Sequence, residues 1–319
     1  LFIAAGSSFG TMRPLQVATA NWFVRKRGRA MGLLMVGSGL GGSLVFLFAM
    51  LIDNVGWEKA SIIGGLLIWG IGLPLASIVR HRPEDMGLSP DGVEEPSNSA
   101  FTDDVQKLAQ GSGLPQIGGS WGAKEALGTR TFWLLLSGTS ITGLGSGGFL
   151  VHMAPYFTDI GLSAEAAAAA VVASAVGSAI GKVSFGLMVE RIHVRYMYTI
   201  QAFATGIALV GLVSVSGAQS ILVGSLIWGV AMGGSATLMG VVWPDYFGRE
   251  SAGTIRGYAM VFQSIVMALS PLFAAFVHDM SGAYGSAFTI LAGSHFIGGT
   301  LIFLAKPPRK RTELASTLT

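Results

Sequence analysis

Two basic residues, Arg13 and Lys182, stand inside long apolar stretches of this 319-residue sequence. Arg13 precedes Val24, just past its stretch, by 11 residues, about 16 Å along a helix, and Lys182 precedes the loop residue Arg191 by nine, about 13 Å. A cation at that depth is costly unless it meets an anion or water. We expect both residues to bind a small organic anion, and the planar guanidinium group suits a carboxylate. The alternatives are an internal ion pair for Arg13 and a snorkelling side chain for Lys182.

Three further polar side chains lie in other apolar stretches. His152 follows a glycine-rich segment. Histidine is the residue type whose charge can change near physiological pH, so His152 is a candidate for proton coupling or gating; a histidine satisfied by interfacial water is the alternative. Gln263 is a candidate hydrogen-bonding partner for a substrate. His295 is expected to pack against lipid or a neighbouring helix.

The sequence offers little for enzyme or metal chemistry. It has no cysteine and no His-Glu-x-x-His segment, and its five histidines are scattered without the spacing of metal ligands. We therefore expect no enzyme activity, no metal and no cofactor.

The candidate residues have to be positioned by membrane-spanning helices. The sequence is 51% hydrophobic and 12% charged, whereas soluble domains carry roughly 25% charged residues. Its apolar residues gather into runs of about 20, the length of a membrane span. We expect an all-α membrane protein, and the lipid bilayer rather than nucleic acid as its partner, because the basic residues stand in short clusters between the runs. The nine expected spans are 1–23, 30–52, 60–79, 131–156, 164–189, 196–216, 219–243, 257–277 and 286–305.

The basic residues are distributed unevenly over the gaps between these spans. If the spans alternate across the bilayer, 17 of the 20 Lys and Arg residues fall on one side and only Lys59 falls on the other. Positive charge marks the cytoplasmic side. We therefore expect a multi-pass protein of the cell membrane with a cytoplasmic C-terminus.

One long polar stretch interrupts the spans. Residues 80–130 read as a cytoplasmic linker, with a short amphipathic helix around Asp103–Ala109 as the alternative. Three spans precede the linker and six follow it. We expect the second half of an N-terminal six-helix bundle at 1–79, a C-terminal six-helix bundle at 131–305, a cytoplasmic tail at 306–319, and a sequence from which the first three helices are missing.

Four segments resemble the major facilitator superfamily, and within it the branch of monocarboxylate porters and oxalate/formate antiporters. They are similar to that branch's loop between helices four and five, the segment that leaves helix six, the loop between helices eight and nine, and the loop between helices ten and eleven. The segments are Trp22–Gly32, Arg82–Gly92, Gly186–Arg195 and Pro244–Gly257.

The resemblance implies a major facilitator fold, with nine of an expected twelve transmembrane helices present, and transport by alternating access. It places Lys182 where animal monocarboxylate porters have an arginine, and Ser178 where they have an aspartate. It also implies a cytoplasmic charge network of Glu190, Arg191 and Arg195. Small residues recur four apart, as at Gly37 and Gly41 and at Gly177 and Gly181, which permits close approach of helices. Plain tight packing accounts for most of these pairs, and at most the fifth and eighth helices are expected to form part of a moving seam.

The function expected from these observations is secondary transport of a small organic anion, as a proton symporter or an anion exchanger. A drug or sugar exporter of the same superfamily is the alternative, and a polytopic membrane enzyme is a distant one.

Overall fold

The computed structural model describes residues 12–92 and 121–308, without the side chains of residues 12, 13, 38–47, 49 and 250. The chain divides into two compact units, residues 1–116 and 117–319. The dividing point lies inside the stretch expected as a linker, of which residues 93–120, including the alternative helix at 103–109, lie outside the described part.

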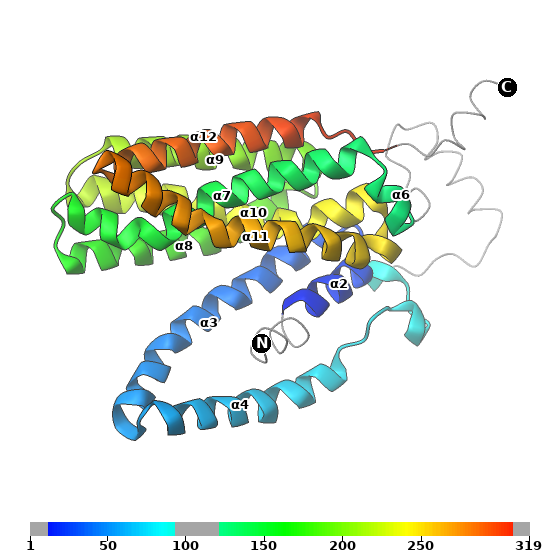
Figure 1. Cartoon of the computed structure of the whole chain (residues 1–319). Coiled ribbons are helices and arrows are strands. Elements are labelled where there is room, and N and C mark those ends of the chain that lie inside the picture. Colours follow the sequence, from blue (N-terminus) through cyan, green and yellow to red (C-terminus); the bar gives the residue numbers. More distant parts are fainter. Residues whose placement is uncertain (1–11, 93–120, 309–319) are drawn as a thin grey trace. The chain divides into compact units, whose positions relative to one another are not determined.

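The described residues of the first unit, 12–92, form three helices and two short 3₁₀ turns (Figure 1). The helix α2 packs on α3, and α3 packs on α4 across a turn at Gly56, whose φ of 83° is a conformation that glycine adopts without strain. Two 3₁₀ turns, η1 and η2, follow α4. The bounds are α2 Met12–Trp22, α3 Arg27–Val55, α4 Trp57–Ile78, η1 Glu84–Met86 and η2 Pro90–Gly92.

Residues 121–308, the described part of the second unit, form a bundle of six long helices preceded by the short α6 (Figure 1). The helix α10 packs on α8 and α9, and α12 packs on α9 and α7, while α11 packs on α7. Chain neighbours are therefore often not packing neighbours. The bounds are α6 Ala123–Leu127, α7 Arg130–Asp159, α8 Ala164–Met188, α9 Val194–Ser214, α10 Ala218–Phe247, α11 Arg249–Ser281 and α12 Tyr284–Leu304.

The long helices follow the expected spans closely except at one connection. The sequence predicted a gap at 244–256, but α10 continues to Phe247 and α11 begins at Arg249. The corner is made by Gly248 alone, with a φ of 84°. The predicted gap was wrong because a helix that leaves the membrane can continue through polar residues.

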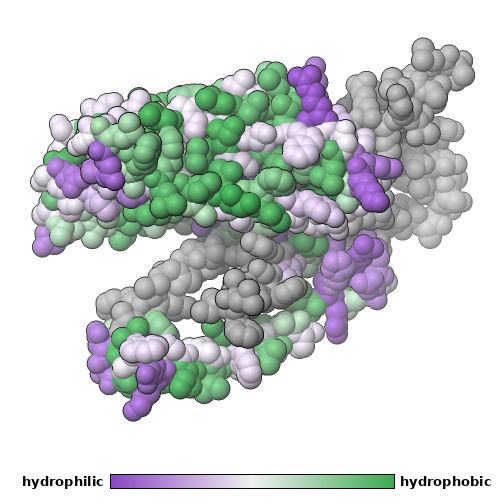
Figure 2. All heavy atoms as spheres, in the orientation of Figure 1, coloured by the Kyte–Doolittle hydropathy of each residue, from purple (hydrophilic) through white to green (hydrophobic). Residues whose placement is uncertain are grey.

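Seven helices of the described residues are long and apolar enough to span a membrane: α4 and α7–α12. The visible face of the α7–α12 bundle is apolar between hydrophilic ends (Figure 2), as expected where lipid surrounds the middle of a bundle. The all-α membrane fold is therefore confirmed, while the count of nine spans stays a prediction.

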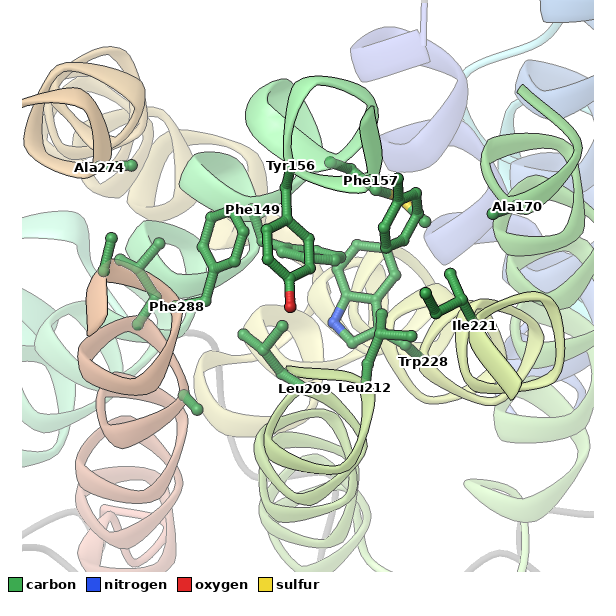
Figure 3. Close-up of a cluster of buried hydrophobic side chains, with 14 of the residues drawn as sticks. Phe149, Tyr156, Phe157, Ala170, Leu209, Leu212, Ile221, Trp228, Ala274 and Phe288 are labelled. Carbon is green, nitrogen blue, oxygen red and sulfur yellow. The ribbon is translucent and has the colours of Figure 1, made fainter. Parts of the chain in front are cut away.

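An aromatic core fills one end of the bundle (Figure 3). The ring of Phe149 lies 4.7 Å from that of Trp228 and 4.9 Å from that of Phe288, centroid to centroid, and Tyr156 lies 5.0 Å from Phe288. These residues come from the end of α7 and from the beginnings of α10 and α12. Because successive helices are antiparallel, the core lies at the end that carries the turns near 160–163, 215–217 and 282–283.

The glycines of α8 pack inside this bundle. A Cβ added at Gly181 would overlap the carbonyl oxygen of Val230 in α10, and one added at Gly229 would overlap that of Ser174 in α8. Gly177 and Gly233 meet the partner helix in the same way. Gly177 and Gly181 thus serve tight packing of α8 on α10, the alternative given for these glycines, while the expectation that α8 forms part of a moving seam stays a prediction.

Candidate functional site

A cavity of about 200 Å³ lies inside the second unit. Its walls come from α7, α9, α10, α11 and α12, and its residues lie on the side of the aromatic core away from the 160–163 turn. The described lining residues include none with a permanent charge. They are Thr139, Ser140, Thr142, Gly143, Ser146, Tyr198, Gln201, Met232, Ser235, Ala236, Met239, Gln263, Met267 and His295.

Among the sequence-predicted site residues whose side chains the structure describes, Gln263 alone lines this cavity. Its side-chain Nε2 donates a hydrogen bond to the Oγ1 of Thr139, 2.8 Å away, and so joins α11 to α7. Thr139 in turn donates to the carbonyl of Leu135 in its own helix. This hydrogen bond fixes the orientation of the Gln263 side chain at the wall of the cavity.

Sequence reasoning missed three residues at the back of the cavity. Ser140, Gln201 and His295 are buried, with exposed fractions of 9%, 2% and 1%. The expected packing of His295 against a neighbouring helix is confirmed, since its Nε2 lies 3.5 Å from the Oγ of Ser146 in α7, but its place in the lining of the cavity was not expected. The sequence feature that could have identified these residues is a polar side chain in the middle of an apolar run, the same feature that identified Lys182.

Lys182 lies in α8 and is not among the residues that line the cavity. Its side chain is half-buried, and within the described residues its ammonium group has no ion pair or hydrogen bond. Its backbone carbonyl accepts a hydrogen bond from Thr237 Oγ1 in α10 at 3.1 Å. Arg13, its predicted companion, belongs to α2 of the other unit, and its side chain lies outside the described part.

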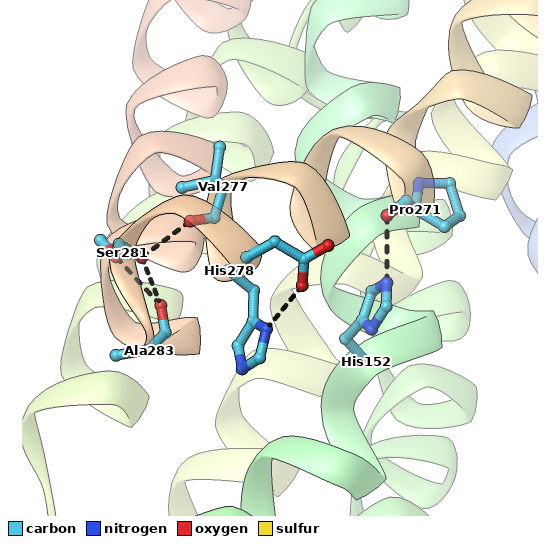
Figure 4. Close-up of polar contacts among 8 residues, drawn as sticks. His152, Pro271, Val277, His278, Ser281 and Ala283 are labelled. Carbon is cyan, nitrogen blue, oxygen red and sulfur yellow. Dashed lines mark hydrogen bonds and ion pairs between the residues drawn. The ribbon is translucent and has the colours of Figure 1, made fainter.

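His152 is part of a ring cluster that joins α7, α11 and α12. Its Nε2 lies 3.1 Å from the carbonyl oxygen of Pro271 in α11 (Figure 4). Its ring lies 5.3 Å from that of Tyr284, and the ring of His278 stacks on Tyr284 at 4.1 Å. The Nδ1 of His278 also contacts Asp279 Oδ1 at 3.4 Å. Two histidines thus flank one tyrosine ring at the same end of the bundle as the aromatic core.

Arg195 fixes the start of α9 to the end of α12. Its Nε donates a hydrogen bond of 2.5 Å to the carbonyl of Phe303, and its guanidinium lies 4.9 Å from the centre of that ring. These contacts with α12 were not part of the expected charge network. Glu190 and Arg191, its other expected members, lie in the turn between α8 and α9.

His193 begins α9. Its Nδ1 accepts a hydrogen bond from the backbone N–H of Arg195 at 3.1 Å, which satisfies a donor at the helix start. Burial lowers the pKa of His193; the charge of Asp245 opposes this and that of Arg195 adds to it. The neutral form, which can accept the hydrogen bond, is therefore favoured.

In the first unit, the segment after α4 is tied to the turn before α3. The indole Nε1 of Trp22 donates to the carbonyl of Arg80 at 2.9 Å, and Asn21 Nδ2 donates to that of His81 at 3.2 Å. Asp91 accepts from the backbone there as well. Two of the four segments that carried the family resemblance are therefore bound to each other.

The described part of the second unit is a bundle of long helices, each apolar enough to span a membrane. The chain belongs to the Major Facilitator Superfamily, whose model matches residues 1–271 and 135–318. It is thus a member of a family of multi-pass membrane transporters, which supports a role other than catalysis.

Curated relatives are transporters at low identity. The chain is 24% identical over 318 residues to Monocarboxylate transporter 11 of Mus musculus, covering 96% of this chain and 66% of that protein. It is 26% identical over 302 residues to Monocarboxylate transporter 11 of Homo sapiens, and the match covers 90% of this chain and 58% of that protein. It is also 26% identical over 314 residues to the MFS-type transporter pynF of Aspergillus niger, with 95% and 65% covered. The chain therefore spans 58 to 66% of the length of these relatives.

Solved structures share the fold. The fucose:proton symporter FucP of E. coli matches with a TM-score of 0.59 at 14% identity, covering 92% of this chain and 74% of that one. A structure of FucP in the outward conformation matches with a TM-score of 0.57 at 13% identity, with 93% and 72% covered. At this identity the likeness supports the fold alone.

Proposed function

We propose that this protein moves a small organic anion, a mono- or dicarboxylate, across the cell membrane by alternating access, as a proton symporter or an anion exchanger. The observation that carries the proposal is Lys182, a half-buried cation inside α8 whose ammonium group has no partner within the described residues. A cation inside a membrane-spanning helix is stabilised by an anion or by water. A carboxylate substrate would supply that anion.

The relatives support a carboxylate over other cargo. Two of those described above are named monocarboxylate transporters, and the match covers 90% or more of this chain. Because the identity is 24 to 26%, the substrate of this chain does not follow from their names. It rests on the chemistry of Lys182, which would repel a cationic drug.

Other residues take proposed roles in the same cycle. Arg13 is a second cation for the substrate, from the first unit, and Gln263 a hydrogen-bonding partner. His152, Glu190, Arg191 and Arg195 are proposed for gating or proton coupling. Ser178 stands where the animal porters have an aspartate, so a proton carrier other than that residue is needed if protons are the coupling ion.

The test is counterflow of labelled oxalate, lactate and pyruvate by the whole protein in liposomes, beside a neutral sugar. A charge-assisted hydrogen bond contributes about 1.5 to 3 kcal/mol, so Lys182→Gln is expected to weaken carboxylate binding by about 10-fold to 150-fold. Arg13→Gln is expected to do the same, and Arg13→Lys to restore little if the contact is bidentate.

The matched control is Lys59→Gln, which removes an exposed lysine at the beginning of α4. It should leave the carboxylate affinity unchanged. Saturable exchange of the sugar alone would overturn the substrate class. Unchanged affinity in both Arg13→Gln and Lys182→Gln would overturn the assignment of the site.

A further inference from the structure

Exposed cations gather at one end of the helices of the first unit. Arg25, Arg80 and Arg82 are exposed, and within the described residues their side chains make no hydrogen bond or ion pair. Lys26 is also exposed, and Asp91 lies close enough to feel its charge. Charged side chains that have no partner on the protein are available to a partner outside it.

Side-chain contacts hold the two segments that carry these cations together. The indole Nε1 of Trp22 donates to the carbonyl of Arg80 at 2.9 Å, across 58 residues of chain, and Asn21 Nδ2 donates to that of His81 at 3.2 Å. Asp91, which follows the second segment, accepts the backbone N–H groups of residues 24–26 in the first. The cations therefore stand on neighbouring stretches of backbone. They form one surface, the basic patch, which consists of Arg25, Lys26, Arg80 and Arg82.

The basic patch lies where a membrane-spanning helix ends. The helix α4 is long and apolar enough to span a membrane, none of its most apolar stretch is buried inside the protein, and it ends at Ile78, just before Arg80. Trp22, which is bonded to the carbonyl of Arg80, is of the residue type that is enriched at the surface of a bilayer. The patch is thus expected at the level of the lipid headgroups.

The acidic residues nearby do not cancel the charge of the basic patch. Over residues 21–29 and 80–92, six Lys and Arg residues stand against three acidic ones, Glu84, Asp85 and Asp91. Glu84 has an interaction of its own within the described part, and Asp91 is used by backbone N–H groups. Because Asp91 already occupies the start of α3, an outside anion would meet the arginine and lysine side chains rather than the helix start. The excess positive charge favours an anionic partner.

Large apolar side chains are exposed beside these cations. Met86 is 55% exposed and Leu88 51% exposed, both in the segment that follows Arg82, and Phe23 precedes Arg25 with 36% exposed. A soluble anion would leave these side chains in water. A lipid would cover them with its acyl chains while its headgroup meets the cations.

From this arrangement we propose that the basic patch binds an anionic phospholipid, with the headgroup phosphate on Arg25 and Arg80 and the acyl chains against Met86 and Leu88. The proposal is independent of organic-anion transport, because it uses neither Arg13 nor Lys182. Lys and Arg residues next to the end of a membrane span attract anionic lipids, by about 5-fold in affinity for each residue.

The experiment measures lipid binding to the full chain, purified in neutral detergent micelles, by native mass spectrometry. The probes are phosphatidylglycerol and phosphatidylcholine with identical acyl chains, and glycerophosphoglycerol, which is the headgroup of the first without its acyl chains. We expect phosphatidylglycerol to bind at least about 10-fold more tightly than phosphatidylcholine, the effect of one to two cations. The headgroup alone should not displace phosphatidylglycerol at equal concentration.

Two double variants remove the same charge from different places. Arg25→Gln with Arg80→Gln should weaken phosphatidylglycerol binding by about 30-fold, about 5-fold for each cation, and so abolish the preference over phosphatidylcholine. The matched control is Lys124→Gln with Arg130→Gln, which removes two exposed cations of the second unit and should leave that preference in place.

The variants are designed to keep the fold. Arg80→Gln retains the backbone carbonyl that Trp22 binds, and the replaced side chains have no partner within the described residues. Thermal unfolding checks that each variant is folded. Lys26→Gln with Arg82→Gln repeats the test on the other half of the basic patch and should also reduce the preference for phosphatidylglycerol.

Three results would overturn the proposal. Equal affinity for phosphatidylglycerol and phosphatidylcholine would show that the patch does not select an anionic lipid. An equal loss in the control variant would mean that binding follows total charge rather than this surface. Displacement of phosphatidylglycerol by an equal concentration of glycerophosphoglycerol would assign the patch to a soluble anion. Carboxylate counterflow by the native protein tests the transport proposal separately, whatever the lipid result.

Discussion

The carboxylate of Asp91 accepts the backbone N–H of Arg25 at 2.7 Å, across 66 residues of chain. The same Oδ2 accepts from Val24 at 3.0 Å, and Oδ1 accepts from Lys26 at 3.3 Å. Asp91 has a φ of 60°, which aspartate tolerates better than most residues. One side chain thus satisfies three consecutive backbone donors just before α3, where the partial positive charge of a helix start favours an anion.

Removal of this carboxylate is expected to loosen the segment after α4. In Asp91→Ala, three N–H groups lose their acceptor, and the unfolding free energy should fall by about 1 to 2 kcal/mol after allowance for partial exposure. Asp85→Ala, which removes an exposed carboxylate of η1, is the control. Unfolding of both variants in mixed micelles, followed by tryptophan fluorescence, measures the difference. A loss of equal size in both would contradict the role of Asp91.

The same contact predicts a dependence on acidic pH. Burial raises the pKa of Asp91, but hydrogen bonds from Arg25, Val24 and Lys26 and the charge of Lys26 outweigh it, so the pKa lies below its ordinary value of 3.8. The folded state therefore binds its proton later than the unfolded state as pH falls. The stabilisation is complete above pH 3.8 and is lost as pH falls through the lowered pKa. Asp91→Asn should lack this part of the acid transition.

His193 predicts a second dependence, closer to neutrality. Its pKa is lowered from 6.5, so the cap on α9 is fully present above pH 6.5 and is lost as pH falls through the lowered value. His193→Asn keeps an acceptor that does not titrate. His193→Ala removes the acceptor and should lower the unfolding free energy by about 0.5 to 2 kcal/mol. When thermal unfolding is measured between about pH 5 and pH 8, His193→Asn should lose less stability as pH falls than the native protein does. Parallel curves for the two would contradict this assignment.

The contact between α8 and α10 predicts sharp sensitivity at its glycines. Gly181→Ala and Gly229→Ala would each drive a methyl group into a backbone carbonyl, which cannot rotate away, and should destabilise the bundle by about 2 kcal/mol or more. Gly211→Ala in α9, where no atom lies within 4 Å of the added carbon, should be neutral or slightly stabilising. If all three variants unfold alike, the two helices are not in backbone contact.

The distribution of basic residues predicts the orientation in the membrane. The sequence contains no cysteine, so single cysteines at Ser97 and Gln219 report separately on the two sides. Position 97 should be shielded from an impermeant maleimide in intact cells, and position 219, at the beginning of α10, should react. As a control, both positions should be labelled when the cells are permeabilised. Labelling of position 97 from outside would reverse the proposed topology.

The sequence by itself determined the helices and the class of protein. Apolar runs near 20 residues predicted the seven helices now seen to be of span length, because a bilayer leaves a helix few other ways to satisfy its backbone. The family resemblance rested on short segments with unusual spacing. It was confirmed by a family match over most of the chain.

Only the tertiary structure decided which polar residues share a space. Gln201 and His295 are 94 positions apart and come together because α9 and α12 pack on each other, although neither is next to the other in the chain. Similarly, Asp91 meets Arg25 because α3 and α4 fold back as a pair. Local sequence patterns report whether a segment is helical and how deep a residue lies, but the neighbours of a side chain depend on how whole helices pack. That is why the cavity was found in the fold, while Lys182 was found in the sequence.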